Sequence, residues 1–237
     1  QIAMYKRCPQ QYYFRYVEGK KIPPKSQRIL GTGVHTGLEE GFREKKLSGG
    51  NDVKIRKIME DKAVETIEMI VKTEQEIDWG EDNLDKIKDD GAKMCRVYYT
   101  EKGKKIKPED VEKEFEIVLN GVDLKLKGKI DLTTKKKIID YKTGAQKPAD
   151  EWIFYDDQLK IYRLVTPLQT EAHWIIRYKT KDPQIFVYQY QPSEQEIQKV
   201  LQDVIIVSKL IRTGYFYRKN DIKICSWCGY KDICQNK

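Results

Sequence analysis

Two aspartates and a lysine have the residue types and the spacing needed for metal-dependent chemistry on a phosphate group. Asp140 and Lys142 are two residues apart in the apolar run 137–143, so on a strand their side chains project from the same face. If Lys135-Lys136 is the turn before that run, Asp131 lies opposite Asp140 and shares this face. Two such carboxylates repel each other unless a cation lies between them, and their oxygen atoms suit Mg²⁺ or Mn²⁺. A lysine beside the metal could stabilise a pentacoordinate phosphate or orient the attacking water.

These three residues also have a purely structural interpretation. Asp and Lys are frequent in this sequence, and a solvent-facing ladder would pair them as ions. Spacing alone favours the structural interpretation, so the metal site depends on further motifs.

The cysteines form a second group with possible chemistry. Cys225, Cys228 and Cys234 are spaced as C-x2-C-x5-C, and Cys8 precedes Pro9 far upstream. Three closely spaced cysteines in a reducing compartment indicate metal-ligating thiolates rather than disulfides. Zinc satisfies that pattern, but tetrahedral binding needs a fourth ligand. The fifth cysteine, Cys95, lies on the apolar face of a predicted helix and is expected in the core.

The elements that must position these residues predict an α/β fold. Apolar residues at helical spacing follow 31–33, so we expect a helix that begins at these glycines and carries His35 in its first turn. Met4 to Val17 predicts one short aromatic-faced helix. Two amphipathic helices fill 51–105, which we expect to be a helical insertion. Strands flank the hairpin signal Asn120-Gly121.

The rest of the chain predicts further strands and helices. A helix is expected from about 152 to 165, then strands near 172–179 and 184–191, then a helix that ends near Arg212. His173 lies in an apolar strand without a motif partner, so we expect a structural residue.

Charge and hydropathy limit the partners. The chain has 45 Lys and Arg residues against 37 Asp and Glu residues, which gives a net charge of +8. This charge favours an anionic partner. It is weak evidence by itself, because acidic residues and lysines are interleaved along the chain. No apolar stretch is long enough to span a membrane, and no export signal is seen. We expect a cytoplasmic protein.

Four motifs together resemble one family. They are Gly-Lys-Ile-Asp at 128–131, Lys-Ile-Ile-Asp-Tyr-Lys-Thr-Gly at 137–144, Gly-Thr-Gly-Val-His at 31–35 and Gln-Leu-Lys-Ile-Tyr at 158–162. Their order and their expected elements resemble the PD-(D/E)xK nuclease superfamily, specifically its RecB-like branch. The resemblance implies a restriction-endonuclease-like core with a central mixed β-sheet flanked by helices.

The resemblance also implies roles for individual residues. The implied metal ligands for Mg²⁺ or Mn²⁺ are His35, Asp131, Asp140 and the backbone carbonyl of Tyr141, with Lys142 as the catalytic lysine. Gln158 and Tyr162, one helical turn apart, would steady the site or touch the DNA backbone. Two positions depart from the usual pattern. Ile130 occupies the position for which the superfamily's name has Pro, and Asp140 occupies a position where many members have Glu. Glu114 is a possible accessory carboxylate, although a ladder ion pair is the better interpretation.

One subset of RecB-like nucleases, which includes AddB-type recombination nucleases and CRISPR-associated adaptation exonucleases, holds a [4Fe-4S] cluster with four cysteines. Cys8, Cys225, Cys228 and Cys234 match those positions. The implied cluster would be a staple that joins the N- and C-termini, in a subdomain of 1–17 plus 222–237. Zinc is the alternative at the same cysteines.

The expected protein is a single nuclease domain over 1–237 that acts as a metal-dependent DNA exonuclease or end-processing enzyme in repair, recombination or CRISPR adaptation. DNA, as single strands or duplex ends, is the expected substrate. The chain has no P-loop motif, so a helicase or CRISPR adaptation proteins are expected only as separate partners. The rival interpretation is a non-catalytic DNA-binding or scaffold subunit of a recombination or CRISPR adaptation complex.

Overall fold

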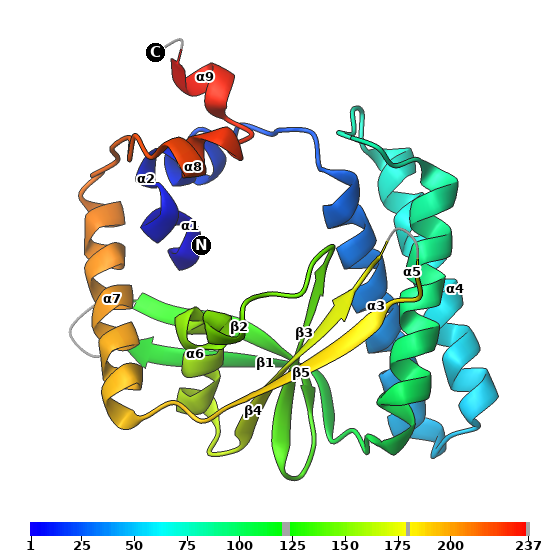
Figure 1. The fold of residues 1–237 in the computed structure, drawn as a ribbon. Coiled ribbons are helices and arrows are strands. Elements are labelled where there is room, and N and C mark those ends of the chain that lie inside the picture. Colours follow the sequence, from blue (N-terminus) through cyan, green and yellow to red (C-terminus); the bar gives the residue numbers. More distant parts are fainter. Residues whose placement is uncertain (120–123, 179–180, 236–237) are drawn as a thin grey trace. The chain divides into compact units, whose positions relative to one another are not determined.

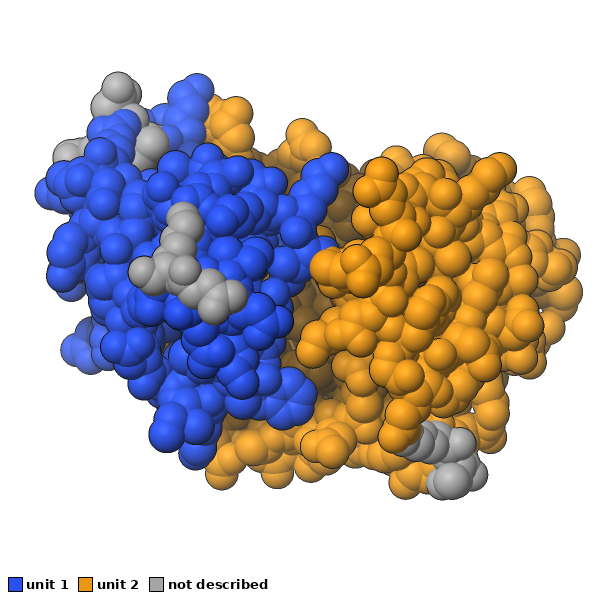
Figure 2. Space-filling view, turned by 90° about the horizontal axis from the view of Figure 1, so that it is seen from above, with its two compact units in different colours: residues 1–22, 118–125, 194–237 blue, residues 23–117, 126–193 orange. Residues whose placement is uncertain are grey.

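The chain divides into two compact units in a computed structural model that describes residues 1–119, 124–178 and 181–235. The smaller unit contains 1–22, 118–125 and 194–237, and the larger unit contains 23–117 and 126–193 (Figure 2). The Asn120-Gly121 turn that the sequence predicts lies outside the described residues. Among the described helices, none is both long enough and apolar enough to cross a membrane.

A five-stranded mixed sheet forms the centre of the fold (Figure 1). The strand order is β1-β2-β3-β4-β5, with β3 and β4 parallel and the pairs β2–β3 and β4–β5 antiparallel. The strands are β1 Asp110–Leu119, β2 Leu124–Thr133, β3 Lys137–Gly144, β4 Gln169–Ile176 and β5 Gln184–Tyr190. Helices cover the sheet, which confirms the predicted α/β, restriction-endonuclease-like fold.

The register between β2 and β3 follows from the short turn that joins them. Leu132 pairs with Ile139, and Thr133 pairs with Ile138. The side chain of Thr134 accepts the backbone N–H groups of Lys136 and Lys137, which fixes the turn. This is the predicted register, and it brings Asp131 beside the segment that contains Asp140.

Three helices cover one face of the sheet. They are α3 Ser26–Ser48, α4 Asp52–Thr73 and α5 Leu84–Glu101, the last followed by the short 3₁₀ helix η2 Gly103–Lys105. Asn51 and Asn83 cap α4 and α5 by accepting backbone N–H groups of their first turns. The three helices share one core with Leu132, Ile139 and Ile175 of the sheet.

The prediction that α3 begins at its glycines was wrong, because the helix begins at Ser26 and the glycines lie inside it. A methyl group at Gly33 would lie 2.5 Å from Ile67, and one at Gly37 would lie 2.4 Å from the carbonyl oxygen of Met59. The glycines therefore allow α3 to pack closely against α4, a tertiary requirement that outweighs their poor helix propensity. His35 lies in the middle of α3 rather than in its first turn.

The other face of the sheet is covered by α6 Asp157–Val165, which follows the 3₁₀ helix η3 Asp150–Tyr155. Asp156 caps α6 by accepting the N–H groups of Gln158 and Leu159. Leu159 and Tyr162 are buried in a second core with sheet residues that include Ile130 and Ile138.

The smaller unit contains segments from both ends of the sequence. Its elements are α1 Ile2–Arg7, α2 Pro9–Tyr12, the π-helical turn η1 Tyr13–Val17, α7 Glu194–Arg212, α8 Ile222–Ser226 and α9 Lys231–Gln235. The single helix predicted for Met4 to Val17 is therefore wrong. Cys8 is extended and separates two helices, and Pro9 occupies the first position of the second helix, where its missing N–H costs nothing.

Candidate active site

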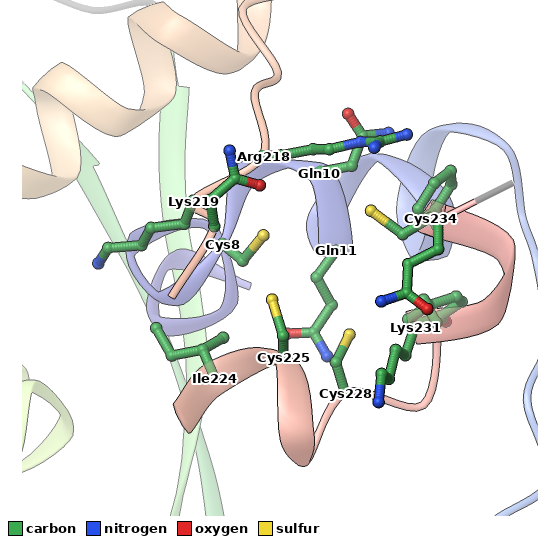
Figure 3. A pocket seen from close by; sticks show the side chains of 14 residues that line it. Cys8, Gln10, Gln11, Arg218, Lys219, Ile224, Cys225, Cys228, Lys231 and Cys234 are labelled. Atoms are coloured by element: carbon green, nitrogen blue, oxygen red, sulfur yellow. The ribbon is translucent and has the colours of Figure 1, made fainter. Parts of the chain in front are cut away.

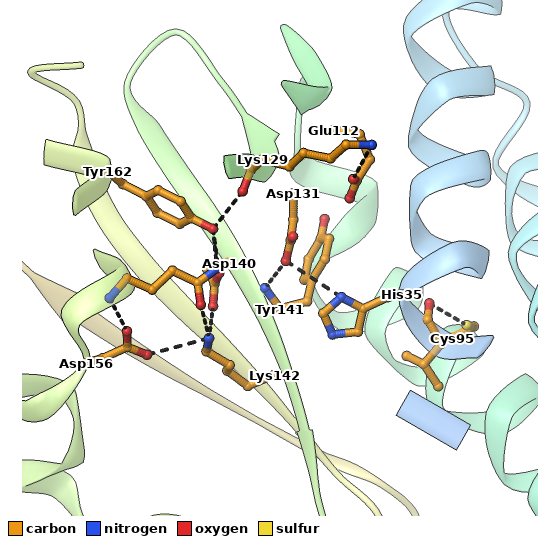
Figure 4. Close-up of polar contacts among 12 residues, drawn as sticks. His35, Cys95, Glu112, Lys129, Asp131, Asp140, Tyr141, Lys142, Asp156 and Tyr162 are labelled. Atoms are coloured by element: carbon orange, nitrogen blue, oxygen red, sulfur yellow. Dashed lines mark hydrogen bonds and ion pairs between the residues drawn. The ribbon is translucent and has the colours of Figure 1, made fainter. Parts of the chain in front are cut away.

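Side chains from α3, β2, β3 and α6 meet within the larger unit (Figure 4). The structure brings together all of the larger-unit side chains that the motifs single out. They are His35 on α3, Asp131 on β2, Asp140 and Lys142 on β3, and Gln158 and Tyr162 on α6.

Asp131 connects β2 to β3 through its side chain. Its Oδ2 atom accepts the backbone N–H of Tyr141 at 2.7 Å and lies 3.8 Å from Nδ1 of His35. The ring of Tyr141 is buried against Tyr98 and Phe42, and the ring of His35 meets its edge. The aromatic packing therefore holds the Tyr141 backbone where Asp131 can bind it.

Asp140 and Lys142 form an ion pair in which Nζ of Lys142 lies 2.8 Å from Oδ2 of Asp140. Apart from this ion pair, the buried Oδ2 has no hydrogen-bond partner among the described residues. The ammonium group of Lys142 also donates to Oε1 of Gln158 at 2.8 Å and lies 3.5 Å from Oδ2 of Asp156. One cation is thus held by three oxygen-bearing side chains.

Tyr162 and Gln158 support the ion pair from α6. The Tyr162 hydroxyl lies 3.1 Å from Oδ1 of Asp140 and 2.9 Å from the backbone carbonyl of Lys129, and its single hydrogen is shared between these acceptors. Nε2 of Gln158 donates to the same hydroxyl. The i, i+4 spacing of Gln158 and Tyr162 puts both on one face of α6, which explains how they reach β3 together.

Burial controls the protonation of the site. Burial raises the pKa of Asp131, and the negative charge of Asp140 raises it further. Burial also raises the pKa of Asp140, although the ammonium group of Lys142 opposes this shift. Burial disfavours the charge of Lys142, but Asp140 and Asp156 outweigh it and raise the pKa of Lys142. Burial and the charge of Lys142 lower the pKa of His35 to about 4, so its ring is neutral at neutral pH.

A sequence model of the PD-(D/E)XK nuclease superfamily matches residues 1–235. The chain belongs to that superfamily. The match covers nearly all of the sequence, including every residue of the site described above.

Solved structures similar to this PD-(D/E)XK chain include that of a candidate exonuclease from Eubacterium rectale. It is 16% identical, with a TM-score of 0.49, and the similarity covers 84% of this chain and 86% of the other. The structure of a protein named SSO0001 is 13% identical, with a TM-score of 0.38, over 98% of this chain and 94% of the other. No curated protein matches the sequence.

The donor set of this PD-(D/E)XK site suits a hard divalent cation, because it combines two carboxylates with raised pKa values, one buried and one half-buried, with the neutral imidazole beside Asp131. Within residues 1–119, 124–178 and 181–235, however, no three His, Cys, Asp or Glu side chains are arranged as a group that holds one ion. Asp140 is instead paired with Lys142, and Asp131 is bonded to the Tyr141 backbone. Metal binding would therefore exchange these contacts for a cation.

Sequence reasoning missed two acidic residues of this site. Asp156 faces Lys142, and the charge of Glu112 on β1 raises the pKa of Asp131. Glu112 has a φ of 52°, a left-handed conformation that sequence does not reveal. Asp156 precedes a helical run, so a capping signal was present for its position but not for its contact with Lys142. Glu114, by contrast, is exposed and lies 3.4 Å from Lys129 as an ion pair.

Two further residues lie as the sequence suggested. Cys95 is fully buried in the helical core. His173 is buried, with Nε2 2.9 Å from Oε2 of Glu171 and Nδ1 2.7 Å from the Tyr98 hydroxyl.

The remaining four cysteines meet in the smaller unit. Cys8, Cys225, Cys228 and Cys234 are free thiols that line one cavity of about 120 Å³. Figure 3 shows their sulfur atoms turned toward this space. Burial raises the pKa of the Cys228 thiol, and the other three thiols raise it further. Thiolates gathered around one cavity would be stabilised by a cationic centre between them.

Proposed function

We propose that this PD-(D/E)XK protein is a metal-dependent DNA nuclease of the RecB-like branch that acts as an exonuclease or end-processing enzyme. The observation that carries the proposal is the meeting of the half-buried Asp131 and the buried Asp140, two carboxylates with raised pKa values, beside the ammonium group of Lys142. Such a pair has the charge to hold a divalent cation, and the lysine has the charge to bind a phosphate.

The residues that would hold Mg²⁺ or Mn²⁺ are Asp131, Asp140 and His35, together with the backbone carbonyl of Tyr141. A bound divalent cation supplies Lewis-acid stabilisation of the charge that develops on the scissile phosphate. The neutral ring of His35 can present a nitrogen lone pair, because its pKa lies well below neutral.

Lys142 is the residue we propose to act on the reacting phosphate. Its ammonium group stays charged because the pKa is raised, and Gln158 and Asp156 hold it beside Asp140. A charge that is fixed before the reaction stabilises the developing negative charge without reorganisation. Gln158 and Tyr162 are positioning residues, since they contact Lys142 and Asp140.

Cleavage of labelled single-stranded and duplex DNA in Mn²⁺ or Mg²⁺, compared with EDTA, tests the proposal. We expect cleavage to fall by about 10²-fold or more in Asp140→Asn, which keeps the shape of the side chain and removes its charge. Asp61→Asn, on the exposed surface of α4, makes the same chemical change away from the site and should cleave as wild type does. DNA binding without cleavage in the wild type would support the scaffold interpretation instead.

We further propose that Cys8, Cys225, Cys228 and Cys234 hold a [4Fe-4S] cluster. The support is their shared cavity, toward which all four sulfur atoms turn in Figure 3. A single tetrahedral Zn²⁺ with bonds of about 2.3 Å requires sulfur atoms roughly 3.8 Å apart. A four-iron cluster spans a wider space and fits four thiols that surround a cavity.

Anaerobic purification followed by visible absorbance and metal analysis tests the cluster. We expect brown protein with iron and sulfide, and loss of the absorbance in Cys228→Ser. Cys95→Ala is the matched control, because Cys95 is buried in the core of the larger unit and should leave the absorbance intact. Colourless protein with stoichiometric zinc would show that the cluster assignment is wrong.

The resemblance to AddB-type and CRISPR-associated nucleases extends the proposal to partners. A helicase or CRISPR adaptation proteins would act with this chain in the cytoplasm. Co-purification of tagged protein with such components from its native cells checks this extension.

A further inference from the structure

A lysine-rich cavity opens on the larger unit, away from the catalytic carboxylates. Its volume is about 950 Å³. Six lysines line it, and we call it the lysine basin: Lys102, Lys105, Lys107, Lys135, Lys136 and Lys137. They come from the segment after α5, from the β2–β3 turn and from the start of β3.

Five of these lysines lack a partner within the described part of the chain. Lys102, Lys105, Lys107, Lys135 and Lys136 make no ion pair there, although Glu101 and Glu109 also line the cavity. Elsewhere on the same unit, exposed lysines are commonly paired, as in Lys54–Glu44, Lys57–Asp61 and Lys62–Glu65. The positive charge of these five basin lysines is therefore not balanced by ion pairs, whereas that of Lys54, Lys57 and Lys62 on α4 is.

Part of the lining of the basin is a hydrogen-bonded network centred on Glu171. Glu171 is 2% exposed, and its Oε2 lies 2.6 Å from Nζ of Lys137 and 2.9 Å from Nε2 of His173. Nε2 of Gln189 donates to Oε1 of the same carboxylate at 3.0 Å. Burial opposes the charge of Glu171, but these partners outweigh it and lower its pKa to about 2. Because the glutamate is fully engaged, it does not cancel the charge of the five free lysines.

The chemistry of the lining selects the ligand. The only apolar side chains that line it are Ile106 and Val187, and no Phe, Tyr or Trp is present to stack on a base. A site of this kind recognises negative charge and does not distinguish one base from another. Proteins bind the nucleic-acid backbone in this way. Lysines spread over two separate segments, 102–107 and 135–137, match a ligand with regularly spaced charges better than a single small anion.

We propose that the lysine basin binds the phosphate backbone of a DNA strand at a site separate from the catalytic carboxylates. Asp140 of the catalytic site and His173 of the basin project from opposite faces of the sheet. His173 in the basin contacts Tyr98 of α5, whereas Asp140 contacts Tyr162 of α6. Lys137 and Asp140 are three residues apart on β3, about 10 Å along the strand. The inference rests on the proposed function only for the identity of the polyanion as DNA.

The salt dependence of DNA binding tests the basin without any cleavage. The probe is a fluorescent oligo-dT of about 20 nucleotides in EDTA, with the association constant measured by anisotropy over a range of salt concentrations. The test variant is the triple substitution Lys105→Gln, Lys107→Gln and Lys135→Gln. The matched control removes the same three charges at paired lysines of α4 by Lys54→Gln, Lys57→Gln and Lys62→Gln.

We expect the basin variant to lose about 2 from the slope of log K against log salt, since each single-strand phosphate contact contributes roughly 0.7. Its affinity should fall about 10- to 100-fold near 0.1 M salt, while the control variant keeps the wild-type slope. Equal slopes in all three proteins, or equal losses in both variants, would overturn the basin. Cleavage by the wild type in Mn²⁺ is measured separately, so failure of the basin and failure of the nuclease proposal give different results.

Discussion

Nζ of Lys142 lies 2.8 Å from Oδ2 of Asp140, and both groups are mostly buried. The pair also contacts Asp156, Gln158 and Tyr162, so the lysine and the aspartate are held as one unit. Without a metal, the lysine supplies the only cation that the described structure places against Asp140. Changing either residue must therefore alter the electrostatics of the other.

Lys142→Met tests the role of the ammonium group, because it keeps most of the side-chain volume and removes the charge. We expect single-turnover cleavage at saturating Mn²⁺ to fall about 10²- to 10³-fold, as for the loss of one preorganised charge in a dry site. Lys88→Met removes a half-buried lysine that pairs with Glu68 and should leave cleavage unchanged. Undiminished cleavage by Lys142→Met would show that cleavage does not require the ammonium group of Lys142.

Asp131→Asn tests the free-energy cost of the ionised, half-buried carboxylate in the metal-free protein. The folded-state pKa of Asp131 is raised to about 8, above an unfolded value of about 3.9. Its contribution to stability is therefore fully present below about pH 4 and is lost as the pH rises toward about 8. Asn cannot ionise and can still accept the Tyr141 N–H, so the variant in EDTA should be more stable than wild type at about pH 8.

Urea unfolding in EDTA at about pH 5 and about pH 8 measures this difference. We expect the variant's advantage in the free energy of unfolding to grow with pH by about 1 kcal/mol or more. Addition of Mn²⁺ should stabilise the wild type at the higher pH and stabilise Asp131→Asn less. A variant that is less stable than wild type at both pH values contradicts the raised pKa.

Tyr162→Phe tests whether the hydroxyl only positions Asp140. The change removes a buried hydrogen-bond donor from Asp140 and from the Lys129 carbonyl, which should cost about 1 to 3 kcal/mol of stability. A positioning role predicts a lower kcat with little change in KM, because Tyr162 does not contact DNA in that case. A raised KM with unchanged kcat would indicate instead that the hydroxyl binds the substrate.

Gly37→Ala tests the close approach of α3 and α4. The added methyl group would lie 2.4 Å from the carbonyl oxygen of Met59 and 3.0 Å from Sγ of Cys95. Both neighbours belong to the buried core, so we expect a loss of about 1 to 3 kcal/mol despite the higher helix propensity of Ala. Thr32→Ala, at an exposed position of the same helix, should be neutral or slightly stabilising. Circular dichroism during thermal unfolding distinguishes the two.

The sequence was most informative where local chemistry determines geometry. The Lys135-Lys136 turn predicted the register of β2 and β3, and the alternation along β3 predicted that Asp140 and Lys142 share a face. The i, i+4 spacing of Gln158 and Tyr162 likewise predicted that both reach the same site. In each case the relevant contacts are set within one turn or one strand pair.

The sequence was least informative where distant segments determine the outcome. Gly33 and Gly37 lie inside α3 where it packs closely against α4, and no local signal in the sequence reports that close packing. The charge of Glu112 acts on Asp131 from another strand, and Glu112 has a left-handed backbone within β1 that no local pattern predicts. The lysines of the basin come from two segments that carry no shared motif, so their charge could not be distinguished from the interleaved charge of the surface.

The smaller unit joins segments that the ribosome produces at very different times. The Tyr5 hydroxyl donates to the Tyr215 carbonyl, the N–H of Gln10 donates to the Tyr217 carbonyl, and the Tyr230 hydroxyl donates to the Lys20 carbonyl. Cys8 is synthesised early, whereas Cys225, Cys228 and Cys234 are synthesised only after residues 23–193. Since domains commonly fold as they emerge, the larger unit can assemble during translation, whereas the four-cysteine cavity closes only afterwards. Any metal centre in that cavity is consequently acquired late in biosynthesis, after the residues of the candidate site have been synthesised.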